Sequence, residues 1–561
     1  MLTGRGPLLS IDVGTRSVET DRIDGVLSRY VGGRGVGTKL AYDRLPFNVD
    51  PLGPDNALLF SAGPLQTART SFTGRLNCTA VSPLSNGLVS SNAGGFLSQP
   101  FANTGYGALE VTGESDQLLA VHVTDKGVSF EDVPELAGAT VPEVTAHIAD
   151  RRGFDDDEAA SHVACVGPAG ENEVRFAAIV TSGGRVFGRG GLGAVMGSKN
   201  IKCLTFDGDA APSIDVPDVA GEIHAAAAES DHVMKRQGTA GLTGFANEIE
   251  ALPTRYFSEL SFEGIDGISG ERVAEKKYKR GTCSSCAFAC KLPTRDDESG
   301  LETEGPEFET VMAFGSNVGV DDIVDVMGAN ERCDALGLDT IECGAAVAAY
   351  LASEDAFGDA DLVHDLVEKI ASREGVGDLL AEGVARCHDD LGVPDWSMKG
   401  VAFPAHDGRR LNGQGLAYAT SNRGADHLYG SMYVYEYPMV DQERALEPAG
   451  LEGKVDHLVR TENKKAVLDS AILCKFSRTT VESGQLPALL ATTDEALQRL
   501  GERIVTLERD FNARRGFDRD DDDDLPYDLE GLESALDTYY RRRGWNPDGT
   551  VPPDRLAELE P

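Results

Sequence analysis

The sequence contains no run of 18 or more apolar residues, so it predicts no transmembrane helix. Residues 1–16 lack the basic segment and the following apolar segment of a secretory signal peptide. No internal repeat of 20 to 50 residues is visible. We therefore expect a globular protein of the cytoplasm that is not anchored in a membrane.

Basic residues are scarce, because 52 lysines and arginines face 92 aspartates and glutamates, for a net charge of −40. No basic stripe is apparent, and the overall field would repel phosphates, which argues against a nucleic-acid partner. The balance is typical of proteins from a halophilic cytoplasm, where salt screens self-repulsion. We interpret the acidic run at 520–524 as a solvated loop and not as a metal site.

A chain of 561 residues is too long for one core and predicts two to four domains. Residues 1–207 are rich in glycine and in short β-like runs at 57–60, 118–123 and 176–180. The pattern then becomes helical, and a Gly/Pro-rich stretch at 393–415 divides it. The expected class is α+β: an antiparallel β-rich domain (1–207) followed by two mainly helical domains (208–400 and 401–561).

The clearest helical pattern covers residues 494–514. Apolar residues recur there at three- and four-residue steps. Thr492 and Glu495 form a capping-box pattern at its start, and Gly516 is a plausible terminator.

Three of the ten cysteines, Cys283, Cys286 and Cys290, have the spacing C-x2-C-x3-C, and Cys474 stands far along the chain. Four thiolates suit a [4Fe–4S] cluster, which needs one soft ligand per iron. The other cysteines are scattered among apolar neighbours, and we interpret them as small buried hydrophobes. They are Cys78, Cys165, Cys203, Cys333, Cys343 and Cys387.

Other cysteine sites fit the spacing less well. Radical S-adenosylmethionine enzymes use the reverse order, bacterial ferredoxins use C-x2-C-x2-C and are small, and zinc sites usually have two C-x2-C pairs. Large molybdopterin oxidoreductases carry C-x2-C-x3-C, but near the N-terminus. Structural zinc remains the alternative to a cluster.

Two glycine-rich segments, at 185–200 and 90–96, combine close-approach glycines with arginine or polar residues. Backbone amides and arginines of this kind bind phosphates. Neither segment is a Walker loop, because no G-x4-G-K-[ST] is present, and structural turns are the competing interpretation.

The segment 334–339, DALGLD, is echoed by DSAILC at 469–474. The first copy closes one helix at Gly337 and opens another that Asp339 or Thr340 caps. A carboxylate and free backbone amides at a helix junction suit a polar heterocycle with amino donors and acceptors.

Glu307 and Glu309 follow a proline turn just after the cysteine cluster, and either is a candidate general base. In a chain this acidic, an exposed acid is the simpler interpretation. The segment 418–427 holds Tyr418 and His427, and a lone histidine is more often structural.

Together these segments resemble the aldehyde:ferredoxin oxidoreductase family of tungsten-pterin enzymes, in a haloarchaeal-type member. The resemblance follows chain order over nearly the whole sequence. Its motifs are YVGGRGVG (30–37), SAGPL (61–65), SPL (82–84), GPAGEN (167–172), GRGGLGAVMGSK (188–199), the cysteine cluster, GPEFET (305–310), DALGLDT (334–340), LAYATSNRGADH (416–427), FNARRGF (511–517) and LP (525–526).

The resemblance implies tungsten, or less often molybdenum, held by two pyranopterins, with a magnesium ion between their phosphates and the cube beside one pterin. Cys283, Cys286, Cys290 and Cys474 would then ligate the cube. Arg75 would lie between pterin and cluster, and Asn92 and Val186 would offer backbone oxygens to magnesium. The implied phosphate and pterin contacts are Gly94, Arg185, Gly188, Arg189, Asp334, Leu338, Asp339, Arg423, Asp469 and Leu473.

Two positions depart from the family pattern. The second pterin motif usually has glycine where this chain has Ile472, and a β-branched residue takes a left-handed turn only at a cost. Either the backbone differs there or the strain is absorbed, so the Asp469 contact is less secure than that of Asp334. Val186 replaces a frequent alanine, which a backbone ligand tolerates.

The resemblance implies oxidation of a small aldehyde to a carboxylic acid, with electrons passing through the cube to ferredoxin. Glu309, with Glu307 as the fallback, would accept a proton, His427 would bind the substrate oxygen, and Tyr418 would assist. Family members are commonly homodimers. Reduction of a carboxylic acid on the same scaffold, or a non-catalytic iron–sulfur carrier, are the alternatives.

Overall fold

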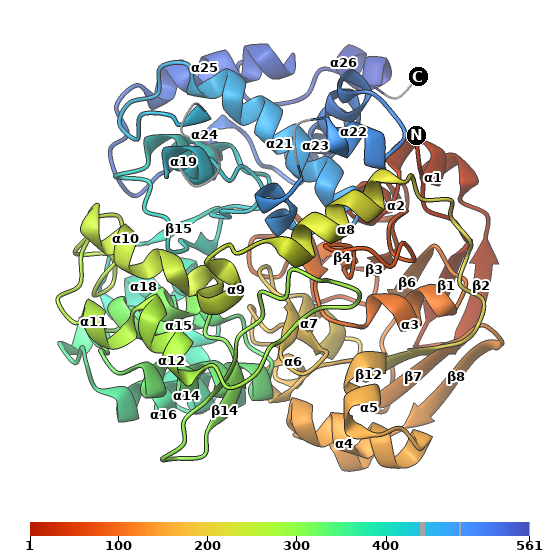
Figure 1. Ribbon diagram of the computed structural model, residues 1–561, viewed down its shortest axis with the longest axis horizontal. Helices are drawn as coiled ribbons and strands as arrows, with labels where there is room; N and C mark the ends of the chain where they lie inside the picture. Colours follow the sequence, from red (N-terminus) through yellow and green to blue (C-terminus); the bar gives the residue numbers. More distant parts are fainter. Residues whose placement is uncertain (438–443, 482–483, 560–561) are drawn as a thin grey trace.

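Two six-stranded sheets form the N-terminal part of the computed structural model, which describes residues 1–437, 444–481 and 484–559 (Figure 1). The first sheet has the order β2-β1-β6-β3-β4-β5, and only β1 and β6 pair in parallel. Its strands are β1 (Leu8–Asp12), β2 (Ser17–Asp21), β3 (Leu58–Ser61), β4 (Leu76–Val81), β5 (Leu88–Ala93) and β6 (Ala108–Thr112).

The second sheet has the order β11-β10-β9-β12-β7-β8, and only β12 and β7 pair in parallel. Its strands are β7 (Leu119–Thr124), β8 (Gly127–Asp132), β9 (Val163–Cys165), β10 (Ile179–Thr181), β11 (Arg185–Phe187) and β12 (Ile201–Asp207). The three expected β-like runs overlap β3, β7 and β10, so that prediction is confirmed.

The two sheets share one hydrophobic core. Alternate residues of a strand point to opposite faces, so Phe60 of β3 packs toward the second sheet while Leu59 packs toward helix α2 (Gly33–Arg44). The Phe60 ring lies 5.6 Å from that of Phe187 and 6.3 Å from that of Phe206. This core fixes β5 and β11, whose ends carry the glycine-rich segments.

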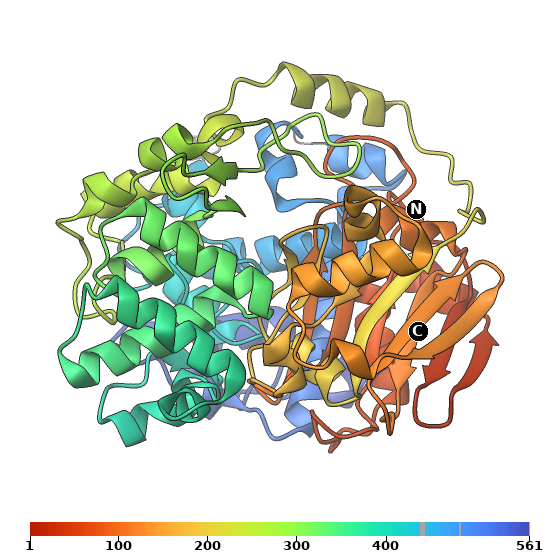
Figure 2. The same ribbon diagram turned by 90° about the horizontal axis from the view of Figure 1, so that it is seen from below.

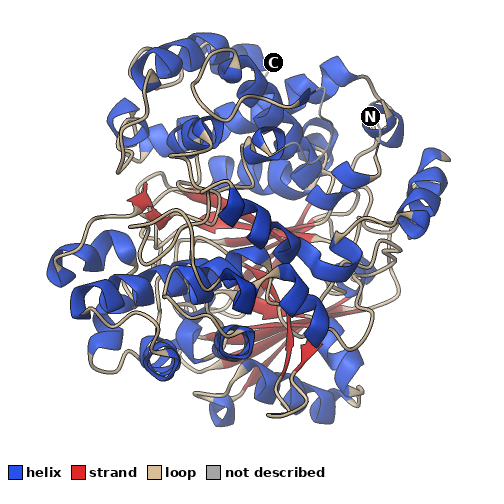
Figure 3. Cartoon of the chain, turned by 60° about the vertical axis from the view of Figure 1, so that its left-hand side comes forward, coloured by secondary structure: helices blue, strands red, loops and turns tan. Residues whose placement is uncertain are grey.

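Helices dominate the rest of the chain and lie beside and around the sheets (Figures 2 and 3). The N-terminal part adds α1 (Asp24–Tyr30), α3 (Ser98–Asn103), α4 (Val141–Arg152), α5 (Asp156–His162), α6 (Pro168–Glu171) and α7 (Leu192–Gly197). The α+β class with an N-terminal β-rich part is thus confirmed.

The middle of the chain is helical apart from two short hairpins, β13 (Pro293–Arg295) with β14 (Glu302–Glu304) and β15 (Ser397–Met398) with β16 (Val401–Ala402). Its helices are α8 (Val219–Glu229), α9 (Met234–Gln237), α10 (Thr243–Glu248), α11 (Ile265–Ile268), α12 (Gly270–Lys276), α13 (Phe308–Val311), α14 (Ile323–Leu336), α15 (Thr340–Glu354), α16 (Ala360–Ser372), α17 (Val376–Leu380) and α18 (Val384–Leu391).

The C-terminal helices are α19 (Asn412–Thr420), α20 (Tyr433–Glu436), α21 (Lys454–Ser470), α22 (Gln485–Leu489), α23 (Asp494–Arg514), α24 (Arg519–Asp522), α25 (Leu532–Arg543) and α26 (Pro553–Leu559). Helix α23 covers the predicted span. Its cap is Thr493, whose side chain accepts a hydrogen bond from the Ala496 amide, so the prediction of Thr492 was wrong by one residue. No helix within the described residues combines the length and apolar character needed to cross a bilayer.

The acidic run at 520–524 differs from expectation. Residues 519–522 form α24, and Asp522 is fully buried, 2.8 Å from Arg509 and 2.6 Å from Lys399. The solvated-loop prediction was wrong for this residue, because two buried cations compensate its charge. The six scattered cysteines are all buried, as predicted.

Candidate active site

Segments between residues 75 and 476 meet around one cavity of about 340 Å³. It is lined by most of the residues that the sequence singled out. These are Arg75, Asn92, Gly94, Arg185, Val186, Gly188, Arg189, Cys283, Cys290, Glu307, Glu309, Asp334, Leu338, Asp339, Arg423, His427, Asp469 and Cys474. Three predicted residues, Cys286, Tyr418 and Leu473, do not line it.

The four predicted cluster cysteines surround a smaller pocket next to this cavity, with which it shares Arg75 and three of the thiols. Its remaining walls are largely apolar and include three phenylalanines. They are Phe72, Phe288 and Phe476. Four thiols in an apolar enclosure match the ligand set of a [4Fe–4S] cluster.

The spacing of these sulfurs argues against zinc. A tetrahedral zinc ion with Zn–S bonds near 2.3 Å holds its sulfurs about 3.8 Å apart. Within the described residues, the only group of three or more metal-ligating side chains whose donor atoms all lie within 4.8 Å is Glu309, His406 and His427. No three of the four cysteine sulfurs therefore lie within 4.8 Å of one another, which is wider than one tetrahedral zinc ion requires.

Arg75 connects the two cavities. Its guanidinium donates hydrogen bonds to Sγ of Cys474 (3.3 Å) and to the carbonyl of Asn92 (3.0 Å). The Cys283 sulfur accepts another from the amide of Gly95, at 3.3 Å. These contacts place Arg75 between the thiols and the larger cavity.

Arginines with unused donors line the larger cavity. Nε of Arg185, Nη1 of Arg189 and Nε of Arg423 are buried and have no hydrogen-bond partner in the described part of the chain. Other donors of Arg189 and Arg423 bind backbone carbonyls, including that of Gly188, which fixes both side chains. Buried guanidinium donors that lack partners suit an anionic group such as a phosphate.

The first helix junction has the predicted form. Helix α14 ends at Gly337, which is left-handed (φ 79°), and Asp339 caps α15 by accepting from the Glu342 amide. Burial raises the pKa of Asp334 to about 8. A half-buried carboxyl group that faces a cavity and is mostly protonated at neutral pH suits a ligand with hydrogen-bonding donor and acceptor groups.

The second junction repeats this backbone turn at the end of α21. The amide of Leu473 donates to the Leu468 carbonyl over 2.8 Å, as the amide of Leu338 does to that of Cys333. Ile472 takes the left-handed position (φ 55°) that Gly337 takes in the first copy. The backbone is therefore unchanged, and of the two possibilities left by the sequence, the strain is absorbed.

Ile472 is fully buried, and two glycines make room for it. A Cβ atom added to Gly63 would lie 2.7 Å from Cγ1 of Ile472, and one added to Gly33 would lie 3.1 Å from Cγ2 of Ile472. Asp469, three residues earlier, is held by Asn92 Nδ2 (2.8 Å) and by Lys475 Nζ (2.7 Å). Packing thus offsets the strain and keeps Asp469 oriented toward the cavity.

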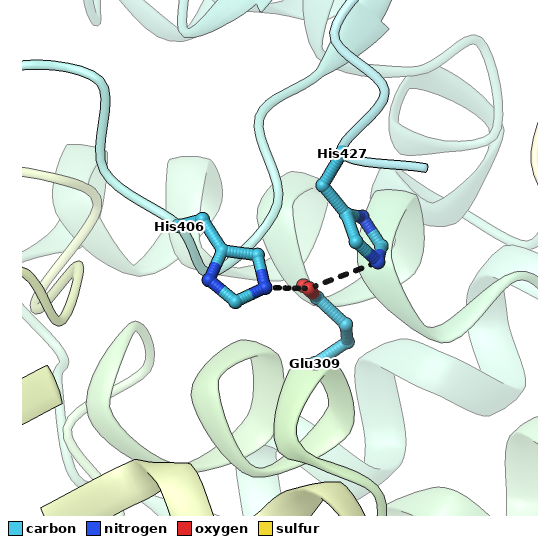
Figure 4. A group of neighbouring side chains, drawn as sticks. All are labelled: Glu309, His406 and His427. Atoms are coloured by element: carbon cyan, nitrogen blue, oxygen red, sulfur yellow. Dashed lines mark ion pairs between the residues drawn. The ribbon is translucent and has the colours of Figure 1, made fainter. Parts of the chain in front are cut away.

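Two histidines converge on Glu309, which lies on α13 just before a π-helical turn (Met312–Ser316) (Figure 4). Its Oε1 lies 3.4 Å from Nε2 of His427 and 3.5 Å from Nε2 of His406. Its Oε2 accepts a hydrogen bond from the Ala405 amide (2.7 Å). The carboxylate is therefore oriented by the backbone, with one oxygen between two imidazoles.

His406 stacks on the ring of Tyr433, with centroids 3.6 Å apart. Burial, with the nearby His427 and Arg478 charges, holds the pKa of His406 well below its ordinary range, so this imidazole is neutral at pH 7. Tyr418 donates from its hydroxyl to the His406 carbonyl (2.8 Å). Tyr418 thus holds the His406 segment and does not reach the cavity.

His406 was not predicted. It lies in the Gly/Pro-rich stretch at 393–415, which suggested only a connection, and a single histidine there carries no spacing signal. Glu307, the fallback base, accepts from the hydroxyl and amide of Thr239. Leu473 is buried and lines a neighbouring cavity.

The donor set fits the cofactors that the resemblance implies. Unused guanidinium donors match phosphates, carboxyl groups at two equivalent turns match two pterin rings, and four thiols around one pocket match an iron–sulfur cluster. Asn92 and Val186 both line the same cavity.

Comparisons with known proteins agree along the full chain. The family model for the aldehyde ferredoxin oxidoreductase N-terminal domain matches residues 8–208, and that for domains 2 and 3 matches residues 218–560. The tungsten-containing aldehyde ferredoxin oxidoreductases of Pyrococcus furiosus and Thermococcus kodakarensis are each 33% identical, over 99% of this chain and 98% of theirs.

Two further matches have names that describe other activities. An aliphatic sulfonate oxidoreductase, WOR-like subunit, of Pyrococcus furiosus is 27% identical over 100% of this chain and 97% of its own. The active site complex BamBC of benzoyl coenzyme A reductase with 1,5 dienoyl-CoA has the same fold, at a TM-score of 0.83 and 22% identity, covering 99% of this chain and 96% of that one. With both family models matched, the chain belongs to the aldehyde ferredoxin oxidoreductase family.

Proposed function

We propose that this protein oxidises a small aldehyde to its carboxylic acid at a tungsten-bispyranopterin centre and passes the electrons through a [4Fe–4S] cluster to ferredoxin. The observation that carries the proposal is the position of Glu309 and His427 on the wall of the cavity that the thiols and arginines also line. The proposed acid–base pair and the proposed redox site would then share one space.

The bound centre would supply the two-electron redox chemistry, and the chain supplies binding, orientation and protons. Glu309 Oε1 accepts a proton from water or from the aldehyde hydrate. His427 Nε2 donates a hydrogen bond to the substrate oxygen. His406, neutral and 3.5 Å from the same carboxylate oxygen, offers a second place for that proton.

Arg75, Asp334 and Asp469 hold the cofactor side of the cavity. The two aspartates would each bind one pterin, with Leu338, Asp339 and Leu473 completing the turns. Arg185, Arg189, Arg423, Gly94 and Gly188 would bind the phosphates, and the carbonyls of Asn92 and Val186 would bind magnesium. Molybdenum in place of tungsten uses the same residues, because pterin sulfurs hold the metal. Homodimerisation and a cytoplasmic location belong to the same proposal.

A second activity on the same site is the reverse or a related reduction, such as that of a carboxylic acid. The match to a subunit named as an aliphatic sulfonate oxidoreductase is the reason to keep this alternative. Rates with an aldehyde and an electron acceptor, against an acid and a reductant, distinguish the two. A non-catalytic electron carrier would leave the arginines and the Glu309 group without a role.

Elemental analysis of anaerobically purified native protein tests the cofactor assignment first. About four irons and one tungsten or molybdenum per chain support the enzyme. Iron without either heavy metal, in protein from metal-replete cells, would establish the electron carrier instead.

The variant Glu309→Gln tests the base. It removes the proton acceptor but keeps shape and volume, so turnover falls by about 10²–10⁴-fold while tungsten stays bound. Glu250→Gln is the matched control, because Glu250 is exposed and pairs only with Arg410 among described residues. Full activity of Glu309→Gln with aldehyde would remove Glu309 from the mechanism.

A further inference from the structure

Three donor atoms from separate segments converge at the wall of the cavity (Figure 4). They are Oε1 of Glu309, Nε2 of His406 and Nε2 of His427, and all lie within 4.8 Å of one another. The oxygen lies 3.5 and 3.4 Å from the two nitrogens. These separations exceed an ordinary N–H···O hydrogen bond of 2.7–3.2 Å, so the contacts are ion pairs by distance and not ordinary hydrogen bonds.

The carboxylate oxygen between the imidazoles is buried and has no hydrogen-bond partner among the described residues. Its twin, Oε2, is fixed by the Ala405 amide. A buried oxygen without a partner costs about 1–3 kcal/mol, so a bound species between these three atoms would be stabilising.

The spacing suits a small transition-metal ion. Metal–ligand bonds of 2.0–2.1 Å in a tetrahedron hold neighbouring donor atoms about 3.4 Å apart. The two measured oxygen–nitrogen separations match this value. Two imidazoles and one carboxylate also form the ligand set of many divalent transition-metal sites.

His406 is prepared for such a role by its surroundings. It is buried, stacked on Tyr433 and held in its neutral form, which is the form that binds metals. Glu309 and His427 line the cavity, so a fourth coordination position would face the space that receives the substrate.

We propose that Glu309, His406 and His427 form a binding site for a divalent transition-metal ion of the zinc type, and that its occupation reversibly inhibits the enzyme. A bound ion takes the lone pairs that Glu309 and His427 need for proton transfer. The inhibition rests on the proposed function, whereas the binding does not.

The site is expected to be of moderate affinity. Metal-binding histidines usually donate their other ring nitrogen to an oxygen acceptor, and loss of such a partner weakens binding by about 10–100-fold. Nδ1 of His406 has no partner within the described part of the chain. Release of the ion by a chelator should therefore be rapid.

Zinc binding to the holoenzyme tests the proposal. The anaerobic protein is titrated with Zn²⁺ in excess Mg²⁺, to occupy surface carboxylates, and bound zinc is counted after gel filtration. We expect one zinc per chain above background, with two nitrogens and oxygen around it by X-ray absorption, and unchanged iron content. His406→Gln and His427→Gln should each weaken binding by about 100-fold or more. His388→Gln, at a partly buried histidine that lies beside Asp389 and does not line the cavity, should not.

The second test measures enzyme activity in the presence of Zn²⁺. With aldehyde as substrate, Zn²⁺ should inhibit the wild type at the concentration at which it binds, and a chelator should restore the rate. Zinc binding without any aldehyde activity would leave the site standing and overturn the proposed function. Equal zinc binding by the wild type and both histidine variants, or a zinc shell of oxygen alone, would overturn the site itself. His427→Gln carries the test if His406→Gln does not fold, because His427 is only partly buried.

Discussion

Arg75 donates a hydrogen bond to Sγ of Cys474 over 3.3 Å. Burial opposes its charge, but the neighbouring Cys474 and Cys283 sulfurs outweigh burial and raise the pKa of Arg75. A permanent positive charge therefore lies beside the thiols that would carry the cluster, where it stabilises added negative charge.

Arg75→Gln should lower the reduction potential of the cluster. The reduced cluster is more negative than the oxidised one, so loss of the cation costs the reduced form more. A differential of about 1.4 kcal/mol, as for one hydrogen bond to a charged group, corresponds to about 60 mV for one electron. Potentiometric titration followed by electron paramagnetic resonance measures the shift. Arg75→Lys keeps the charge and should shift it less; equal potentials in the wild type and Arg75→Gln would contradict the role.

Glu307→Gln should keep most of the activity, in contrast to Glu309→Gln. The Glu307 carboxylate accepts from the hydroxyl and the amide of Thr239, which ties it to the segment that precedes α10. We expect less than about a tenfold loss in kcat, well short of the effect of removing a general base. A loss as large as that of Glu309→Gln would make Glu307 the base.

Substitution of Ile472 separates strain from packing. Ile472→Ala removes buried methyl groups, for a cost of about 2–5 kcal/mol, and keeps the left-handed strain. Ile472→Gly loses the same contacts but relieves about 1–2 kcal/mol of strain. We expect both variants to unfold at lower temperature than the wild type, with the glycine variant the more stable of the two. The reverse order in a thermal melt would show that the backbone is relaxed.

Asp522→Asn should destabilise the C-terminal helices. Removing the carboxylate leaves Arg509 and Lys399 buried without compensation, which costs about 3–5 kcal/mol. Asp520→Asn, in the same run but exposed, is the matched control. The rates of thermal inactivation of the two variants are compared at neutral pH. Equal rates would show that the ion pairs of Asp522 do not stabilise the fold.

The same group predicts a pH dependence. Burial opposes ionisation of Asp522, but the charges of Arg509 and Lys399 outweigh it and hold its pKa below the ordinary value. The contribution of ionised Asp522 to the free energy of unfolding is therefore complete above about pH 4, the pKa of an aspartate in the unfolded chain. It is lost as the pH falls through the lower pKa of Asp522 in the folded protein. Melting temperatures of the wild type and Asp522→Asn should differ by a constant amount from pH 6 to 8 and converge only under strong acid.

The sequence predicted those parts of the site whose residues lie close together in the chain. The cysteine spacing, the two glycine-rich segments and the paired helix junctions each lie within a short stretch, so their residue types carry the signal. The second junction was harder, because Ile472 breaks the glycine rule. Its turn depends on Gly33 and Gly63, which are hundreds of residues away.

Tertiary packing decided the rest. His406 gains its place beside Glu309 from the backbone contact of Ala405 and the Tyr433 ring, neither of which leaves a periodic mark in the sequence. Asp522 looked like one solvated acid among five, and only the approach of Lys399 and Arg509 distinguishes it.

The cavity also has a consequence for how the protein is made. Arg34, on α2 near the N-terminus, holds Glu508 of α23 at 2.7 Å across 474 positions of sequence, and Asp469 and Cys474 come late in the chain. The cavity wall extends along the chain as far as Phe476, so a nascent fragment that ends before this residue lacks part of the wall. A redox centre held by these walls would therefore be loaded only after the segment up to residue 476 has been made and folded.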